Sequence, residues 1–213
     1  LQSQLELLGF TVEAFDILNG AAGDLSDDAV WDPLLRRIKS GMYCVAVISP
    51  PCSTFSRVRN VPGGPRPLRG VEGSSRYGLP GLSKADAELV RTHNLLAFRS
   101  IIASQAFIDI GAAAVFEQPA LRDNEVSMLR LGEFKPILDN ILVTHTISAQ
   151  CSFGAPCQKL TSWVTRKVSF QDTPPKCTHP ILSWFREYIG EEVRAKHAPS
   201  AGTSRYVSSY GEA

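Results

Sequence analysis

"YCVAVISPPCSTFSR", residues 43–57, reads as a buried strand that ends abruptly in a loop. Residues 43–49 are mostly apolar on both faces, which is the pattern of a strand inside a parallel sheet. Pro50 and Pro51 have no backbone N–H to donate, so the chain must leave the sheet there. Cys52 therefore lies just beyond the carboxyl end of the strand, whereas Cys44 is expected in the core. From its position alone, Cys52 is a candidate nucleophile, metal ligand or buried filler.

Strand and helix patterns alternate around this stretch. Ser83, with Asp86 three residues later, is a helix N-cap signal, and Gly41 and Gly111 stand where helices are expected to end. Strands are expected at 11–17, 43–49, 112–119 and 139–148, and helices at 29–39 and 83–110. This alternation predicts an α/β fold with a doubly wound, mostly parallel sheet.

Composition limits the class of protein. The 213 residues are 44% hydrophobic and 20% charged, which suits a soluble, folded domain, and the net charge of +1 indicates no particular partner. No apolar run reaches the roughly 18 residues of a membrane span, and we find no signal peptide. The odd number of five cysteines favours a reducing compartment, nuclear or cytoplasmic. We expect a monomer.

The chain divides into three predicted parts. Residues 1–147 are expected to form the core, 148–197 a small, irregular C-terminal region on the substrate side, and 198–213 a tail rich in Ser, Gly and Tyr. Residues 1–10 lack an initiator Met and read as the end of a helix. We therefore expect an N-terminally truncated fold.

Three predicted strands end in polar residues, namely Asp16, Cys52 and Glu117. Open α/β sheets bind ligands beyond the carboxyl ends of their strands, so these side chains are expected to face one cleft if the strands are neighbours. Arg57 and Arg59 are expected to lower the pKa of Cys52 and favour the thiolate. Glu117 is either a general acid in this cleft or a solvated residue at a strand end.

The chain resembles the DNA (cytosine-5) methyltransferases. "PPCSTFS" is similar to that family's Pro-Cys-Gln-x-Phe-Ser motif, with Ser53 in place of Gln, and "FEQP" is similar to its Glu-Asn-Val motif. Upstream, "FTVEAFDI" and "AGDLSDD" look like the family's two cofactor-binding segments. The glycine-rich first motif of the family has no counterpart, and no clear Gln-x-Arg-x-Arg motif is present.

The resemblance implies a Rossmann-like methyltransferase fold and a specific reaction. The reaction would transfer a methyl group from S-adenosylmethionine to carbon 5 of cytosine in DNA, with the base flipped out of the duplex. Cys52 would add to carbon 6 of the ring and Glu117 would act at ring nitrogen 3. The resemblance assigns cofactor contacts to Asp16, Asp24, Pro51 and Phe55.

A basic loop follows Cys52. It holds five arginines between residues 57 and 76 against one acid, so it is either a phosphate-binding loop or a solvated one. Nucleic-acid contacts are expected from Ser56, Arg57, Arg59, Arg66, Arg69 and Arg76, and from Lys159 and Arg166 near the place of the family's missing arginine motif. Two alternatives stay open: a non-catalytic nucleic-acid-binding domain derived from this fold, and a cytosine-5 methyltransferase that acts on RNA.

A second group of cysteines lies towards the C-terminus. Cys151, Cys157, Cys177 and His179 form a C-x5-C…C-x-H pattern that could supply a tetrahedral zinc site. Their irregular spacing favours scattered cysteines instead, and no metal is expected.

Overall fold

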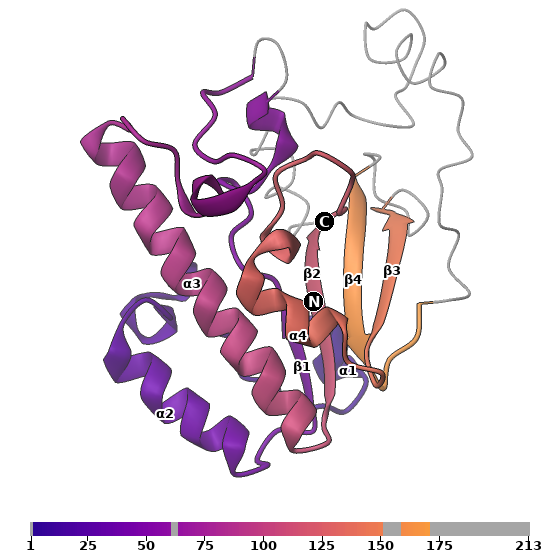
Figure 1. The fold of residues 1–213 in the computed structure, drawn as a ribbon. Coiled ribbons are helices and arrows are strands. Elements are labelled where there is room, and N and C mark those ends of the chain that lie inside the picture. The colour runs from indigo at the N-terminus through magenta and orange to yellow at the C-terminus, as the bar shows by residue number, and fades with distance from the viewer. Residues whose placement is uncertain (1, 61–63, 151–158, 171–213) are drawn as a thin grey trace, which may run out of the picture.

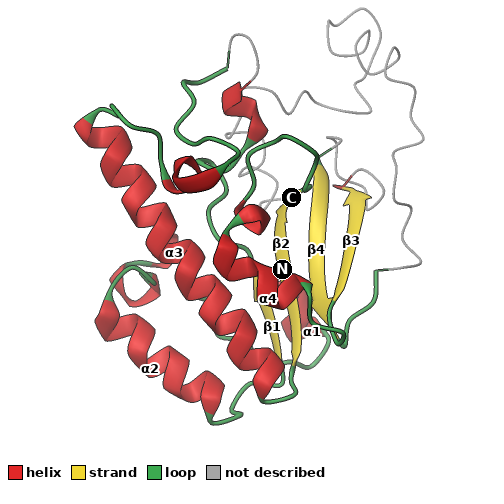
Figure 2. Cartoon of the chain, in the orientation of Figure 1, coloured by secondary structure: helices red, strands yellow, loops and turns green. Residues whose placement is uncertain are grey.

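In the computed structural model, which describes residues 2–60, 64–150 and 159–170, a four-stranded sheet is packed against helices. The strands are β1 (Val45–Ile48), β2 (Ala113–Pro119), β3 (Thr144–Ala149) and β4 (Leu160–Arg166). The helices are α1 (Gln2–Leu7), α2 (Asp28–Lys39), α3 (Lys84–Asp109) and α4 (Lys135–Leu138). Figure 2 shows the sheet beside the long helix α3, with α2 beyond it. An α/β architecture is thus confirmed. No helix in the described ranges is long and apolar enough to cross a membrane.

The strand order is β1-β2-β4-β3, and only β1 and β2 are parallel. The prediction of a mostly parallel sheet was wrong, because β4 enters between β2 and β3 and runs antiparallel to both. Apolar patterning reports that a strand is buried and does not report its direction. β4 also draws residues 160–166, assigned by sequence to a separate C-terminal region, into the same sheet.

The two long helices end at the predicted glycines, α3 begins at the predicted cap Ser83, and α2 begins at a cap that the sequence analysis did not name. The Asp27 side chain accepts from the backbone N–H of Ala29 at the start of α2, and Ser83 Oγ accepts from that of Asp86 at the start of α3. Each helix is followed by a glycine with positive φ, Gly41 at 78° and Gly111 at 78°. The predicted helices at 29–39 and 83–110 are confirmed.

The predicted strand at residues 11–17 is absent. This segment has no regular structure until Ile17, where a 3₁₀ turn begins with Asp16 as its N-cap. Side chains rather than strand pairing hold it in place. Glu13 accepts hydrogen bonds from Arg37, at 2.5 Å, and from Tyr43, and Phe15 packs against the cluster around α2.

Helices α2, α3 and α4 cover one face of the sheet. In that layer α2 contributes Trp31, Leu34 and Ile38, which pack with Phe107 of α3 and Ala114 of β2. A second cluster joins α3 and α4 to Phe116 and Val164, and Figure 1 shows α3 and α4 passing in front of the strands. Because side chains alternate along a strand, Phe116 faces these helices and Glu117 faces the opposite side.

β1 is an edge strand of the described sheet, and its surroundings are more open than the sequence indicates. Val47 is 43% exposed, and Cys44, which directly precedes the strand region, is also exposed. The expectation that Cys44 lies in the core was therefore wrong. An apolar run on both faces resembles a central strand, but β1 has a partner on one side only among the described strands.

Candidate functional site

The carboxyl ends of β1 and β2 place Cys52 and Glu117 at the same edge of the sheet. The two strands are parallel neighbours, with Ile48 opposite Phe116, so the residues after Ile48 lie beside those after Phe116. Ser49 Oγ donates to Glu117 Oε2 over 2.7 Å, which ties the two strand ends together. The predicted juxtaposition of the β1 and β2 ends is therefore present. Asp16, predicted at the same edge on a third strand, instead caps the exposed turn at Ile17.

Glu117 is buried and held from two sides. It is 8% exposed, and its Oε1 accepts from Lys159 Nζ at 2.9 Å, while Oε2 accepts from Ser49. Lys159 directly precedes β4, whose antiparallel pairing with β2 brings it back to this edge. A carboxylate, a hydroxyl group and an amine from three separate segments are thus joined in one hydrogen-bonded group.

Cys52 lies within the electrostatic reach of this group. Burial raises the pKa of its thiol, and the negative charge of Glu117 raises it too, while the positive charge of Lys159 and a backbone hydrogen bond lower it. The net effect is a raised pKa, which contradicts the expected lowering of the Cys52 pKa. Among the side chains that the structure describes, Lys159 is the cation that lowers this pKa. Arg59 donates instead to the backbone oxygens of Ser53 and Arg66.

The turn that carries Cys52 is fixed by the backbone and by Gln118. Pro50 is buried, and its carbonyl oxygen accepts from Gln118 Nε2 at 2.9 Å. Past Cys52 the chain turns sharply, because the N–H of Phe55 donates to the Cys52 carbonyl over 2.8 Å. Phe55 is 1% exposed within the apolar core, whereas Pro51 is exposed, and Ser56 is half-buried.

Two arginines of the basic loop are used inside the protein. Arg69 is 2% exposed, and its guanidinium lies over the Phe55 ring, 3.7 Å from the centroid. Arg76 donates to the backbone oxygens of Val71, at 2.7 Å, and Arg130, at 2.9 Å. Both stabilise the loop from within, so in this conformation Arg69 does not reach a phosphate group outside.

Among the loop arginines whose side chains the structure describes, Arg66 is the exposed one. It donates to Gly81 O at 3.0 Å and lies 3.7 Å from a carboxylate oxygen of Asp86, with 54% of its side chain accessible. The side chain of Arg57 lies outside the part of the chain that the structure describes. Of the predicted phosphate contacts in the loop, Arg66 is the best placed to meet a ligand from solution.

Lys159 and Arg166, predicted together, lie at opposite ends of β4. Arg166 pairs with Ala114 at the beginning of β2 and donates to Ala112 O at 2.6 Å. It is buried and far along the strand from Glu117, which pairs with Trp163. Only Lys159 belongs to the Cys52 edge.

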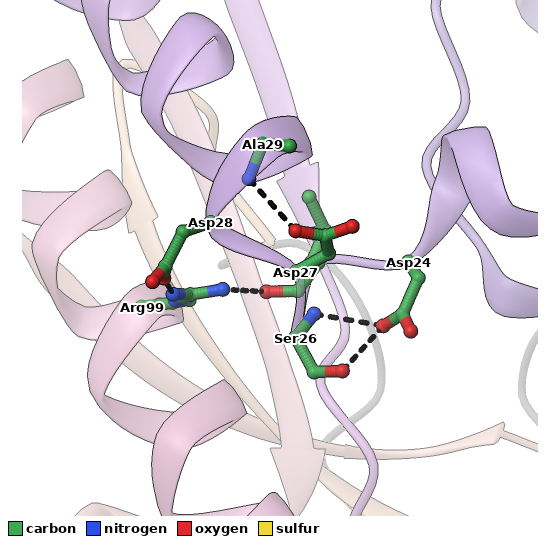
Figure 3. Close-up of polar contacts among 7 residues, drawn as sticks. Asp24, Ser26, Asp27, Asp28, Ala29 and Arg99 are labelled. Atoms are coloured by element: carbon green, nitrogen blue, oxygen red, sulfur yellow. Dashed lines mark hydrogen bonds and ion pairs between the residues drawn. The ribbon is translucent and has the colours of Figure 1, made fainter.

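The two predicted cofactor acids lie on neighbouring turns. Figure 3 shows Asp24 accepting from the N–H and the hydroxyl of Ser26, at 2.8 and 2.7 Å through Oδ1. Asp16 likewise uses Oδ1, which accepts from Leu18 N at 2.9 Å. Gly23 packs on the backbone of Asp16 so closely that an added Cβ would lie 2.1 Å from Asp16 O. This close approach brings the two acids together.

Nearby, Arg99 of α3 anchors the same segment. It donates to Leu25 O at 2.6 Å and pairs with Asp28, and its charge helps to lower the pKa of Asp24, after the hydrogen bonds from Ser26. Figure 3 shows Arg99 beside Asp28, at the start of α2.

The zinc candidates Cys151, Cys157, Cys177 and His179 all lie outside the described residues. Among the residues that the structure does describe, no group of three or more His, Cys, Asp or Glu side chains is placed to hold a metal ion.

Sequence reasoning missed two members of the site, Ser49 and Gln118. Ser49 comes directly after the apolar run of β1, so its place at the strand end was a usable signal. Gln118 stands out in the sequence only as a replacement for Asn in a motif. Its side chain is 0% exposed, and both this burial and its bond to Pro50 depend on tertiary packing, which no local pattern reports.

Comparison with known proteins assigns the chain to no family. No family model, no curated protein and no solved structure matches the chain. The functional conclusion therefore rests on the residues and geometry of the site.

Proposed function

We propose that the Cys52–Glu117 edge transfers a methyl group from S-adenosylmethionine to carbon 5 of cytosine in DNA. The observation that carries the proposal is the meeting of a thiol and a buried carboxylate at the ends of two adjacent parallel strands, where their charges interact. Ligands of open α/β sheets bind at this kind of edge. The resemblance in "PPCSTFS" and "FEQP" falls on the same two residues.

The chain's own groups suit covalent catalysis at a pyrimidine ring. The Cys52 thiolate would form a bond to carbon 6, and the displaced electron pair of the 5,6 double bond would move onto carbon 5 and the ring. The Lys159 ammonium, or Glu117 once it carries a proton, would donate a hydrogen bond to ring nitrogen 3. After carbon 5 is alkylated, loss of its proton expels the Cys52 thiolate and restores the double bond.

S-adenosylmethionine would supply the electrophilic methyl group. Asp16 and Asp24 fit its nucleoside in their chemistry. The hydrogen bonds that hold their turns use Oδ1 of each carboxylate, and within the described residues Oδ2 remains for a ribose or adenine donor. Phe55 does not fit, because it is buried beneath Arg69. We therefore keep the cofactor contacts of the two acids and of Pro51, which is exposed beside Cys52.

A raised thiol pKa makes proton removal part of the proposed reaction. Because Cys52 holds its proton more tightly than a free cysteine, attack on the base requires that proton to leave. The same feature favours a second candidate function, a nucleic-acid-binding domain without catalysis, in which the half-buried thiol is a packing residue and Arg66 contacts phosphate.

Covalent trapping distinguishes these functions. DNA that contains 5-fluorocytosine should form a stable adduct in the presence of S-adenosylmethionine, because fluorine at carbon 5 replaces the proton whose loss would release the Cys52 thiolate. Cys52→Ser should abolish the adduct, and Cys44→Ser, which alters an exposed cysteine, should retain it. A parallel arm with fluorocytosine RNA tests the RNA substrate. Retained DNA binding without an adduct in either arm would reject methyl transfer and support the binding function.

A further inference from the structure

The basic loop folds back onto the residues directly after Cys52. Arg59 Nε donates to Ser53 O over 2.8 Å. Arg69 donates to Thr54 Oγ1 twice, from Nε at 3.1 Å and from Nη2 at 3.0 Å. Two arginines from the loop thus bind Ser53 and Thr54, the two residues that follow Cys52.

Arg69 is also fixed at its other contacts. Its Nη1 donates to Asn94 Oδ1 of α3 at 2.6 Å and to Arg76 O at 2.9 Å. Its guanidinium group stacks on the Phe55 ring. Burial of a guanidinium is unfavourable unless its donors are bonded, and burial lowers the pKa of Arg69 to about 10. An apolar side chain would fill the same space without that penalty. The planar guanidinium group therefore contributes what an apolar side chain cannot, because it holds several hydrogen-bond donors in fixed directions.

The Thr54 hydroxyl group links Arg69 to His93 by hydrogen bonds. Because its oxygen accepts from two N–H groups of Arg69, its own hydrogen is directed at His93 Nδ1, 3.0 Å away on α3. The neutral imidazole accepts this bond. Phe55, the next residue, donates its N–H to Cys52 O. The turn of residues 52–55 is consequently held by α3, by the loop and by its own backbone.

We propose that Arg69 is a positioning residue for Cys52, and that its bonds to Thr54 and its stacking on Phe55 keep the thiol in its enclosed place beside Glu117 and Lys159. The proposal goes beyond methyl transfer and does not depend on it, because the property concerned is the accessibility of a thiol. Failure of the trapping experiment would leave it intact.

The test is the rate at which iodoacetamide alkylates Cys52 between pH 6 and 10 in the full chain. Cys44 and Cys52 share the tryptic peptide 40–57, so fragment ions in tandem mass spectrometry assign the label to one or the other. Arg69→Met retains much of the stacking volume and removes the bonds to Thr54. We expect alkylation of Cys52 to become about tenfold faster or more, with its pH midpoint moved down towards that of a free thiol, because loss of bonds to a charged group frees the turn to open. The rate at Cys44 should not change.

Arg99→Met is the matched control. Arg99 is a second buried arginine, which donates to Leu25 O and lies 5.5 Å from the Trp31 ring centroid, away from the Cys52 turn. It should destabilise the fold to a similar degree and leave the Cys52 rate within about twofold of the parent, as expected for a purely structural loss elsewhere. Equal Cys52 rates and midpoints in Arg69→Met and the parent would overturn the proposal.

A second variant covers the case in which Arg69→Met does not fold. Thr54→Val removes the shared acceptor while keeping the shape of the side chain, so it should accelerate alkylation of Cys52 in the same direction. Arg69→Lys, which keeps the charge and loses the fork, should lie between the parent and Thr54→Val. An unchanged Cys52 rate in a folded Thr54→Val protein would reject the proposal.

Discussion

Lys159 and Glu117 meet at the edge of the sheet, with Lys159 Nζ 2.9 Å from Glu117 Oε1, although 42 residues separate them. Only 18% of the lysine side chain and 11% of the glutamate side chain are exposed. Their pairing depends on β4 lying beside β2. The antiparallel strand β4 thus makes the sheet mixed and also brings Lys159 to Glu117 near Cys52.

Removal of Lys159 should destabilise the fold. Lys159→Met leaves the Glu117 carboxylate buried with Ser49 as its remaining donor, and loss of one partner of a buried pair costs about 3 kcal/mol of unfolding free energy. Urea denaturation followed by circular dichroism measures the loss. Lys135→Met is the matched control, because Lys135 and Asp139 form a pair that is exposed on α4, and its removal should change stability little. The double variant Lys159→Met/Glu117→Gln should recover part of the loss, and no recovery would contradict an interaction between the two.

The two charges should move the pKa of Cys52 in opposite directions. Lys159 lowers this pKa and Glu117 raises it, so Glu117→Gln should move the pH midpoint of Cys52 alkylation down and Lys159→Met should move it up. Peptide-resolved labelling with iodoacetamide measures both midpoints. Cys44, which is exposed, serves as the reference in each protein. Shifts of the same sign in both variants would show that the charges do not act on the thiol as the geometry indicates.

Sequence patterns were sufficient for the features that local chemistry decides. The cap at Ser83 predicted the start of α3, and the glycines at 41 and 111 predicted the ends of both long helices. The two prolines after β1 predicted that Cys52 leaves the sheet, and the parallel pairing of β1 with β2 places Glu117 beside it. These predictions succeeded because each rests on backbone conformation or on hydrogen-bond donors that a residue type supplies or lacks.

The features that failed depend on contacts between distant segments. β4 runs antiparallel to β2, with Glu117 opposite Trp163. No local sequence pattern encodes this pairing between distant segments. Residues 11–17 look like a strand, but ion pairing of Glu13 with Arg37 holds them without a strand partner. Arg69 was expected to contact nucleic acid from the basic loop, and it lies inside because Thr54 and Asn94 satisfy its donors.

Gly23 should tolerate no side chain. A Cβ at this position would lie 2.1 Å from Asp16 O, so Gly23→Ala must displace the turn that joins Asp16 to Asp24. Overpacking of this kind costs about 2 kcal/mol, which urea denaturation would detect. Gly132→Ala is the control, because there the nearest atom, Tyr77 Oη, lies 3.7 Å from an added Cβ. Equal stability of the two variants would show that the turns are not packed together.

His93 should make the protein sensitive to acid. Burial and the charges of Arg69 and Arg59 lower the pKa of His93 from 6.5 to about 4, while Thr54 bonds to its Nδ1. The unfolded chain therefore binds this proton more readily than the folded protein. The stabilisation by neutral His93 is complete above pH 6.5 and is lost as the pH falls towards 4, by about 3 kcal/mol. His93→Gln keeps an acceptor for Thr54 and cannot titrate, so its unfolding free energy should fall less over this range. Urea denaturation of both proteins at pH 7, 5.5 and 4 measures the difference, and parallel pH profiles would contradict the assignment.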